Sequence, residues 1–80
     1  MNNPPPLAAK IAARVEDIRE AKGIKQAYVL ASVPMSRETF SRIKRGERDL
    51  RTVEIFSIAG ALRVSPVELI RPFLNDEAAA

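Results

Sequence analysis

The sequence has 80 residues, enough for one small domain, and its 46% hydrophobic and 29% charged residues are typical of globular proteins. It contains no cysteine and no histidine, which excludes disulfides, thiolate metal sites and the commonest general base of enzymes. The formal net charge is +3, so the placement of the charges matters more than their excess.

The first predicted helix follows a proline-rich amino-terminal segment. We expect residues 1–6 to form a flexible, extended arm that is no signal peptide, with Pro6 suited to be the first helical residue. A stripe of apolar side chains at helical spacing comes next: Leu7, Ile11, Val15 and Ile18. Gly23 supplies the left-handed stop of this helix.

Two short helices are predicted next, on either side of a turn at Pro34. The first spans residues 26–32 and ends before the proline, because a residue that precedes proline avoids the helical region. Ser36 is a strong N-cap for the second helix. The inward pair of this helix and its stop are Phe40, Ile43 and Gly46.

The remainder of the chain predicts two more helices. Thr52 caps the fourth, whose inward stripe has a period of three: Val53, Phe56, Ala59 and Leu62. The fifth begins with an N-cap, a first-turn proline and a capping box, formed by Ser65, Pro66 and Glu68. We expect Pro72 to shorten or kink this helix, and residues 75–80 to form a frayed tail. These patterns predict an all-α fold of five helices, with a core that includes Phe40, Ile43, Phe56 and Leu62.

The positive charge is concentrated in one segment. Residues 37–51 contain six basic and three acidic residues, an excess equal to the net charge of the whole chain. The positive field is therefore focused on the third helix and the loop after it. Such a patch suits phosphate binding, because neutralised phosphates release their counterions. A solvated helical face is the plainer interpretation of the same run of charges.

Residues 26–46, two short helices and a turn, have the shape of a helix-turn-helix motif. Here the sequence resembles the lambda-repressor-like (Cro/C1-type, xenobiotic-response-element) family of DNA-binding domains. The matching residues are IKQ at 24–26, Val29, SRETFSRIKRG at 36–46 and AGALRVSPVEL at 59–69. The resemblance extends from residue 7 to about residue 71. It implies a compact DNA-binding domain over residues 7–74, with nothing appended.

The resemblance also implies roles for individual residues. It makes the start of the third helix the base-reading region, with Arg37, Glu38, Thr39, Ser41 and Arg42 as candidates. An arginine in this position can bind guanine O6 and N7 with two hydrogen bonds. The candidates for phosphate contacts are Lys25, Gln26, Ser36, Lys44, Arg45 and Arg48. Two of these residues have equally good structural roles, because Glu38 suits the helix dipole and Ser36 is a cap first.

The sequence departs from the family pattern at four positions, which are Lys25, Leu30, Pro34 and Lys44. Lys25 removes a helix cap, and Leu30 is larger than the residue that usually lies between the two helices. Pro34 stiffens the turn, and Lys44 replaces a residue that is frequently acidic. The usual ion pair between position 44 and Arg19 cannot form. We expect Arg19 to pair with Glu16 or Glu20 instead, or to point at DNA.

The predicted function is sequence-specific binding of double-stranded DNA by a transcriptional regulator. A small Cro-like or phage-type repressor that occupies an operator fits best, with a restriction-modification controller among the options. An interaction module such as an antitoxin or antirepressor remains the alternative, and a charge reversal of Arg37 and Arg42 would separate the two. Nothing in the sequence indicates an enzyme, a metal site or a cofactor, since it offers no nucleophile–base pair or ligand set.

The predicted partners are double-stranded DNA and a second copy of the chain. In many relatives the fourth and fifth helices form the dimer surface, and Ile70, Phe73 and Leu74 leave apolar groups in that region. We therefore expect a homodimer at least on DNA, and a contact with RNA polymerase stays open. No membrane is expected as a partner, because the longest apolar stretch, residues 55–62, is far too short to span one. Without cysteines or a signal peptide, a cytoplasmic location is the default.

Overall fold

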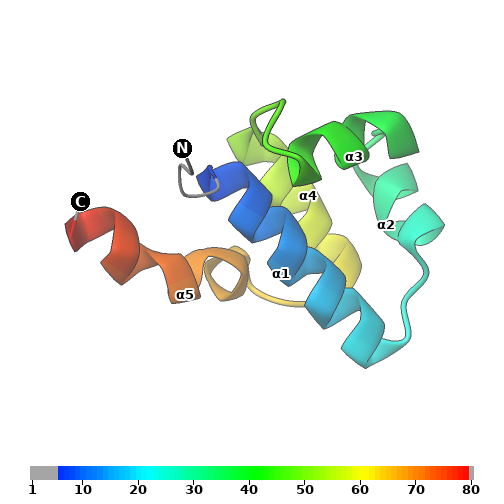
Figure 1. Cartoon of the computed structure of the whole chain (residues 1–80). Coiled ribbons are helices and arrows are strands. Elements are labelled where there is room, and N and C mark those ends of the chain that lie inside the picture. The colour runs from blue at the N-terminus through cyan, green and yellow to red at the C-terminus, as the bar shows by residue number, and fades with distance from the viewer. Residues whose placement is uncertain (1–5, 80) are drawn as a thin grey trace.

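The computed structural model describes residues 6–79, with side chains as far as Leu74, and it contains five helices and no strand in that range. The helices are α1 (Leu7–Lys22), α2 (Gln26–Ser32), α3 (Arg37–Lys44), α4 (Thr52–Leu62) and α5 (Pro66–Ala79) (Figure 1). The prediction of an all-α fold with five helices is confirmed. The predicted arm lies outside the described residues, except for Pro6.

The arrangement places α1 at the centre of the molecule. It packs against α3, α4 and α5, while α2 packs against α3 and α4. In Figure 1, α3 and the loop after it lie on one side of α1, and α5 extends from the other side. The consecutive helices α2 and α3 thus form a unit that is held from behind by α1 and α4.

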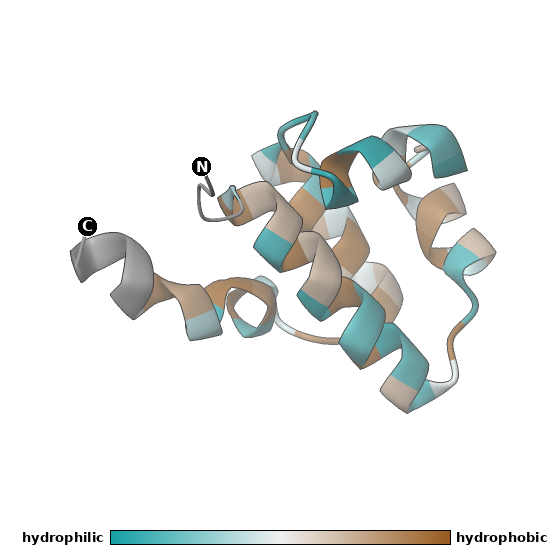
Figure 2. Ribbon diagram, in the orientation of Figure 1, coloured by the Kyte–Doolittle hydropathy of each residue, from teal (hydrophilic) through white to brown (hydrophobic). Residues whose placement is uncertain are grey.

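The core is aliphatic apart from one aromatic ring. Its fully buried large side chains are Val15, Val29, Phe40, Ile43, Ile58, Leu62 and Leu69. The predicted burial of Phe40, Ile43 and Leu62 is therefore confirmed. In Figure 2 the ribbon of α4 is mostly hydrophobic, whereas hydrophilic residues predominate in α3 and the loop after it.

The inward stripe predicted for α4 is wrong in its first half. Phe56 is 58% exposed and Val53 is 68% exposed, whereas Ile58 and Leu62 are completely buried. A strict period of three falls behind the helical repeat by about 60° per step, so after three steps it reaches the opposite face. The buried face follows the usual spacing of three and four residues.

Two helix starts also differ from the prediction by one residue. Arg51 is the N-cap of α4 and Thr52 is its first helical residue. The Glu54 carboxylate reaches back and accepts a hydrogen bond of 2.9 Å from the Arg51 backbone N–H, which is the reciprocal contact of a capping box. Likewise Pro6 is the N-cap of α1, which begins at Leu7.

Helix α5 is not shortened by Pro72. It continues to Ala79, so residues 75–79 are helical and not a frayed tail, while Ala80 lies outside the described residues. Proline has no N–H to donate to the carbonyl four residues earlier, which is that of Glu68. This carbonyl instead accepts a hydrogen bond of 2.9 Å from Arg14 Nε of α1. The side chain of Arg14 thus replaces the donor that the proline lacks.

Candidate nucleic-acid interface

The outer face of α3 is fixed by its cap and its buried side. The Ser36 side chain caps the helix by accepting a hydrogen bond of 3.0 Å from the Thr39 backbone N–H, as predicted. Phe40 and Ile43 anchor the inner side in the core. As a consequence, the predicted base-reading residues Arg37, Glu38 and Arg42 are exposed, and Thr39 and Ser41 are half-buried.

A second hydrogen bond in the cap decides which hydroxyl can reach a ligand. Ser36 Oγ donates to Thr39 Oγ1 over 2.9 Å. The Ser36 hydroxyl therefore uses its proton within the cap, so it can offer no proton to a phosphate while this bond lasts. The Thr39 hydroxyl keeps its own proton and remains a donor.

The five arginines of residues 37–51 fall into two groups. Arg45 pairs with Glu47 at 3.1 Å, and Arg48 binds both carboxylate oxygens of Glu54, at 2.8 and 3.0 Å. The Arg48 hydrogen bonds hold the pKa of Glu54 below its usual value, so this carboxylate stays charged at neutral pH. Arg48 is half-buried in this pair, and it anchors the loop to α4.

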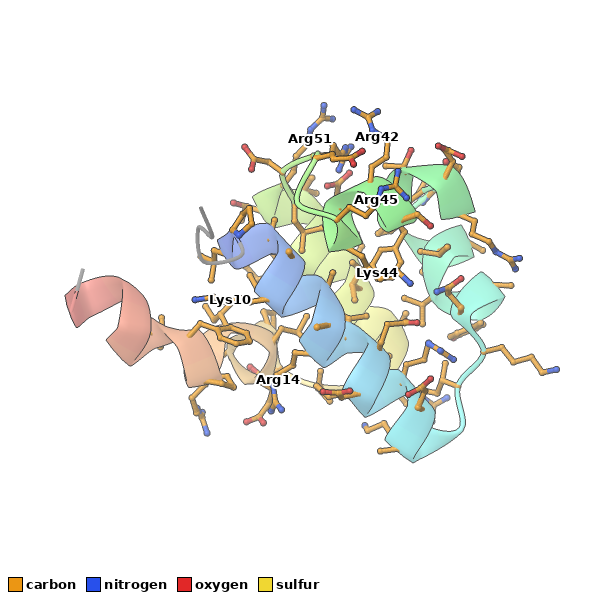
Figure 3. The ribbon with its side chains drawn as sticks, viewed as in Figure 1. Lys10, Arg14, Arg42, Lys44, Arg45 and Arg51 are labelled. Atoms are coloured by element: carbon orange, nitrogen blue, oxygen red, sulfur yellow. The ribbon has the colours of Figure 1, made fainter. Side chains whose placement is uncertain are left out.

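The second group is open to solvent. Among the described residues, no carboxylate lies within ion-pair distance of Arg37, Arg42 or Arg51, and all three are exposed. Figure 3 shows Arg42 and Arg51 extending outward from the same edge of the molecule. Arg51 was counted in the basic run but was not assigned a role from the sequence, because its position relative to α3 depends on the loop.

Lys44 lies apart from this edge. Its Nζ atom is 5.4 Å from the centre of the Phe40 ring, a cation–π contact. The pKa of Glu16 on α1 is lowered mainly by the hydrogen bonds from Arg19 and to a lesser extent by the charge of Lys44, so Lys44 lies near α1.

The start of α2 carries two more candidates. Lys25 is exposed at the N-cap and makes no side-chain cap, as its departure from the family pattern predicts. Gln26 is half-buried, and its Nε2 donates to Glu16 Oε1 over 3.1 Å. Arg19 pairs with Glu16 at 2.8 Å and with Glu20 at 3.6 Å, so the expectation that it turns to these acids is confirmed.

The two remaining departures lie inside the motif. Leu30 is 6% exposed and belongs to the core, as does Met35 after the turn at Pro34. The Met35 N–H donates to the Leu30 carbonyl over 3.0 Å, which closes the turn. The larger side chain is thus accommodated between the helices, and α3 stays packed on the core.

The described residues contain no group of three or more carboxylates that could hold a metal ion. None of their helices is long and apolar enough to cross a membrane.

Comparisons with known proteins place this geometry in context. No protein-family model matches the chain. Over 55 residues it is 36% identical to y4dJ of Sinorhizobium fredii, described as an uncharacterized HTH-type transcriptional regulator, and the match covers 69% of this chain and 71% of that protein.

Two solved structures are similar over most of their length. The restriction-modification controller protein C.AhdI from Aeromonas hydrophila is 31% identical with a TM-score of 0.66, over 78% of this chain and 94% of that one. The clp gene regulator ClgR from C. glutamicum is 19% identical with a TM-score of 0.75, over 91% and 95% of the two chains. At this low identity, ClgR shows the fold alone.

Proposed function

The chain belongs to the helix-turn-helix (HTH) transcriptional regulators, a class that acts by binding DNA rather than by catalysis, and we propose that it represses transcription by occupying a specific operator. The observation that carries this proposal is the two-sided nature of α3. Its inner side is locked by Phe40 and Ile43, while Arg37 and Arg42 extend from its outer side without a carboxylate partner. A short, rigid helix with free arginines on one face suits the major groove.

Base recognition is assigned to the exposed side of α3, from Arg37 to Arg42. Arg37 and Arg42 each bind O6 and N7 of a guanine, a contact worth about 1–3 kcal/mol of discrimination. Thr39 donates its free hydroxyl proton to a base or phosphate oxygen. Glu38 accepts from a cytosine amino group, and the half-buried Ser41 contacts a base edge at closer range.

Phosphate contacts flank this helix on both sides. Arg51 and Arg45 contact the backbone beyond the carboxyl end of α3, and Lys25 and Gln26 contact it at the start of α2, with Lys44 between them. Arg48 and Ser36 act mainly on the protein itself, because the former holds the loop through Glu54 and the latter caps α3. Residues 7–74 form the DNA-binding domain in this proposal.

A homodimer would use the apolar surface between α1, α4 and α5. Exposed side chains there include Leu7, Phe56 and Leu74, at 38%, 58% and 51%, and they border an open apolar hollow of about 350 Å³. A two-fold dimer through this surface sets two α3 helices about 34 Å apart, one turn of DNA, and requires inverted half-sites. Repression then follows from occupancy alone and needs no contact with RNA polymerase. Access to the chromosome makes the cytoplasm the site of action.

Selection from a random pool of duplex DNA at near-physiological salt tests this function. We expect one enriched motif, as two inverted copies one turn apart for a dimer. The variant R37E/R42E should lose the motif while it keeps its helical circular dichroism spectrum and melting temperature. The matched control R63E/R71E makes the same charge change on exposed residues away from α3 and should retain binding. If no motif is enriched, or if both double variants bind equally, operator recognition by α3 is wrong and the partner-protein alternative takes its place.

A further inference from the structure

The side-chain amide of Gln26 is held in place in the absence of DNA. Gln26 is the first residue of α2, and its Nε2 donates a 3.1 Å hydrogen bond to Glu16 Oε1 on α1. The contact joins two residues ten positions apart in sequence, on two different helices, and it is partly shielded from water. A residue proposed to touch phosphate is therefore already fixed by a second residue that belongs to another helix.

Glu16 is itself firmly fixed. Arg19 donates from Nε to one carboxylate oxygen over 2.8 Å and from Nη2 to the other over 3.1 Å. A third nitrogen of the same guanidinium, Nη1, donates to the Ile24 carbonyl over 2.8 Å, just before α2 begins. The Arg19 hydrogen bonds keep the pKa of Glu16 below its usual value, so the carboxylate is charged at neutral pH. Only 19% of the Glu16 side chain and 16% of the Arg19 side chain are exposed.

The chemistry of the two partners sets the orientation of the amide. A charged carboxylate only accepts hydrogen bonds, so the NH₂ group of Gln26 must face it rather than the carbonyl oxygen. One amide proton is used by Glu16, and the second proton on the same nitrogen remains available. A DNA phosphate also only accepts, and an amide turned by 180° would present lone pairs to it instead.

We propose that Glu16 is a positioning residue for DNA binding, which holds Gln26 in the one amide orientation that can donate to a backbone phosphate. This inference rests on the proposed function and identifies an element that supports its phosphate contacts from behind. Because Arg19 balances the charge of Glu16, the acid causes little repulsion of the DNA. The hydrogen bond from Gln26 and the nearby charge of Lys44 connect Glu16 of α1 with both helices of the motif.

A double-mutant cycle on operator affinity measures the effect. The variants are E16A, Q26A and the double variant, each assayed well below its melting temperature so that all are folded. The loss of charge at position 16 contributes equally in both backgrounds and cancels. Fixing one flexible side chain in advance corresponds to a coupling of about threefold to tenfold in Kd. Q26A should therefore weaken binding in the wild-type background by that factor more than in the E16A background.

The matched control is E20A, since Glu20 also pairs with Arg19, at 3.6 Å, but has no contact with Gln26 in the described structure. Its effect should be additive with that of Q26A. An NMR spectrum of the free protein gives a readout independent of DNA. The Gln26 side-chain NH₂ proton that is bonded to Glu16 should be shifted downfield in the wild type and in E20A, and in E16A it should move to the position of a solvent-exposed glutamine amide. Additive effects of E16A and Q26A, or unchanged shifts in E16A, would overturn the proposal. Absence of operator binding by the wild type would instead refute the proposed function.

Discussion

The hydrogen bond from Arg14 to the Glu68 carbonyl gives a sharp prediction about the stability of α5. Replacement of Arg14 by Met keeps an unbranched side chain that reaches as far as the arginine Nε but removes the donor, which leaves the carbonyl opposite Pro72 unpaired. A hydrogen bond from a charged donor contributes about 1.5–3 kcal/mol, and we reduce this to about 1–2 kcal/mol because the Arg14 side chain is 33% exposed. For a domain of this size the melting temperature should fall by about 4–8 °C for each kcal/mol.

Urea denaturation of four proteins isolates this contact: the wild type, R14M, P72A and the double variant. P72A restores a backbone N–H that can donate to the same carbonyl, so R14M should cost much less in that background, below about 0.5 kcal/mol. R71M is the matched control, because Arg71 pairs with the Glu68 carboxylate at 3.4 Å but makes no bond to its carbonyl in the described structure. Equal costs of R14M in both backgrounds would refute the reasoning, since the arginine would then act only through charge or packing.

Three further predictions concern other parts of the fold. F56A should cost less than about 1 kcal/mol of monomer stability, because the Phe56 ring is 58% exposed. It should nevertheless weaken dimerisation measured by analytical ultracentrifugation. A loss of several kcal/mol of monomer stability would place the ring in the core. G60A should stabilise the protein by about 0.5–1 kcal/mol, because an added Cβ would meet open space. In the same thermal melts G46A should destabilise it, because Gly46 has a φ of +78° and a Cβ there would lie 3.0 Å from Pro6. The opposite order of the two stabilities would contradict the geometry. The hydrogen bonds from Arg48 lower the pKa of Glu54 in the folded state. The contribution of this carboxylate to stability is therefore present above pH 4.5 and is lost as the pH falls through the lower folded pKa. E54Q should flatten that part of the acid denaturation curve, and an unchanged curve would argue against the ion pair.

The fold could be predicted from the sequence because its helix boundaries are signalled locally. The capping side chain of Ser36 and the fixed backbone geometry of Pro66 each predict a helix start from the local sequence alone. In the structure Ser36 is the N-cap of α3 and Pro66 is the first residue of α5. The failure at Pro72 has a long-range cause. The continuation of α5 depends on Arg14, which is 54 residues away from its acceptor, and no pattern within the helix indicates that donor.

The interface could be predicted only as a region. A count of charges identifies residues 37–51, but it gives every cation in the segment the same weight. The fold of the loop after α3 decides which arginine is paired with a carboxylate. Arg48 reaches Glu54 six residues later in the sequence, and both side chains are then partly shielded from solvent. For the same reason Arg51 could not be distinguished from Arg48 in the sequence, although only Arg51 is open to solvent.

The division of these cations bears on how such a small domain can be selective. Non-specific affinity grows with the number of phosphates that free cations neutralise. Here two arginines are paired with Glu47 and Glu54, so they add less to the attraction for any DNA than unpaired cations would. Of the three arginines without a carboxylate partner in the described structure, Arg37 and Arg42 lie on the face of α3 that would meet the bases. A protein built in this way gains most of its affinity only where the base contacts are right, because its weak background attraction does little to hold it elsewhere.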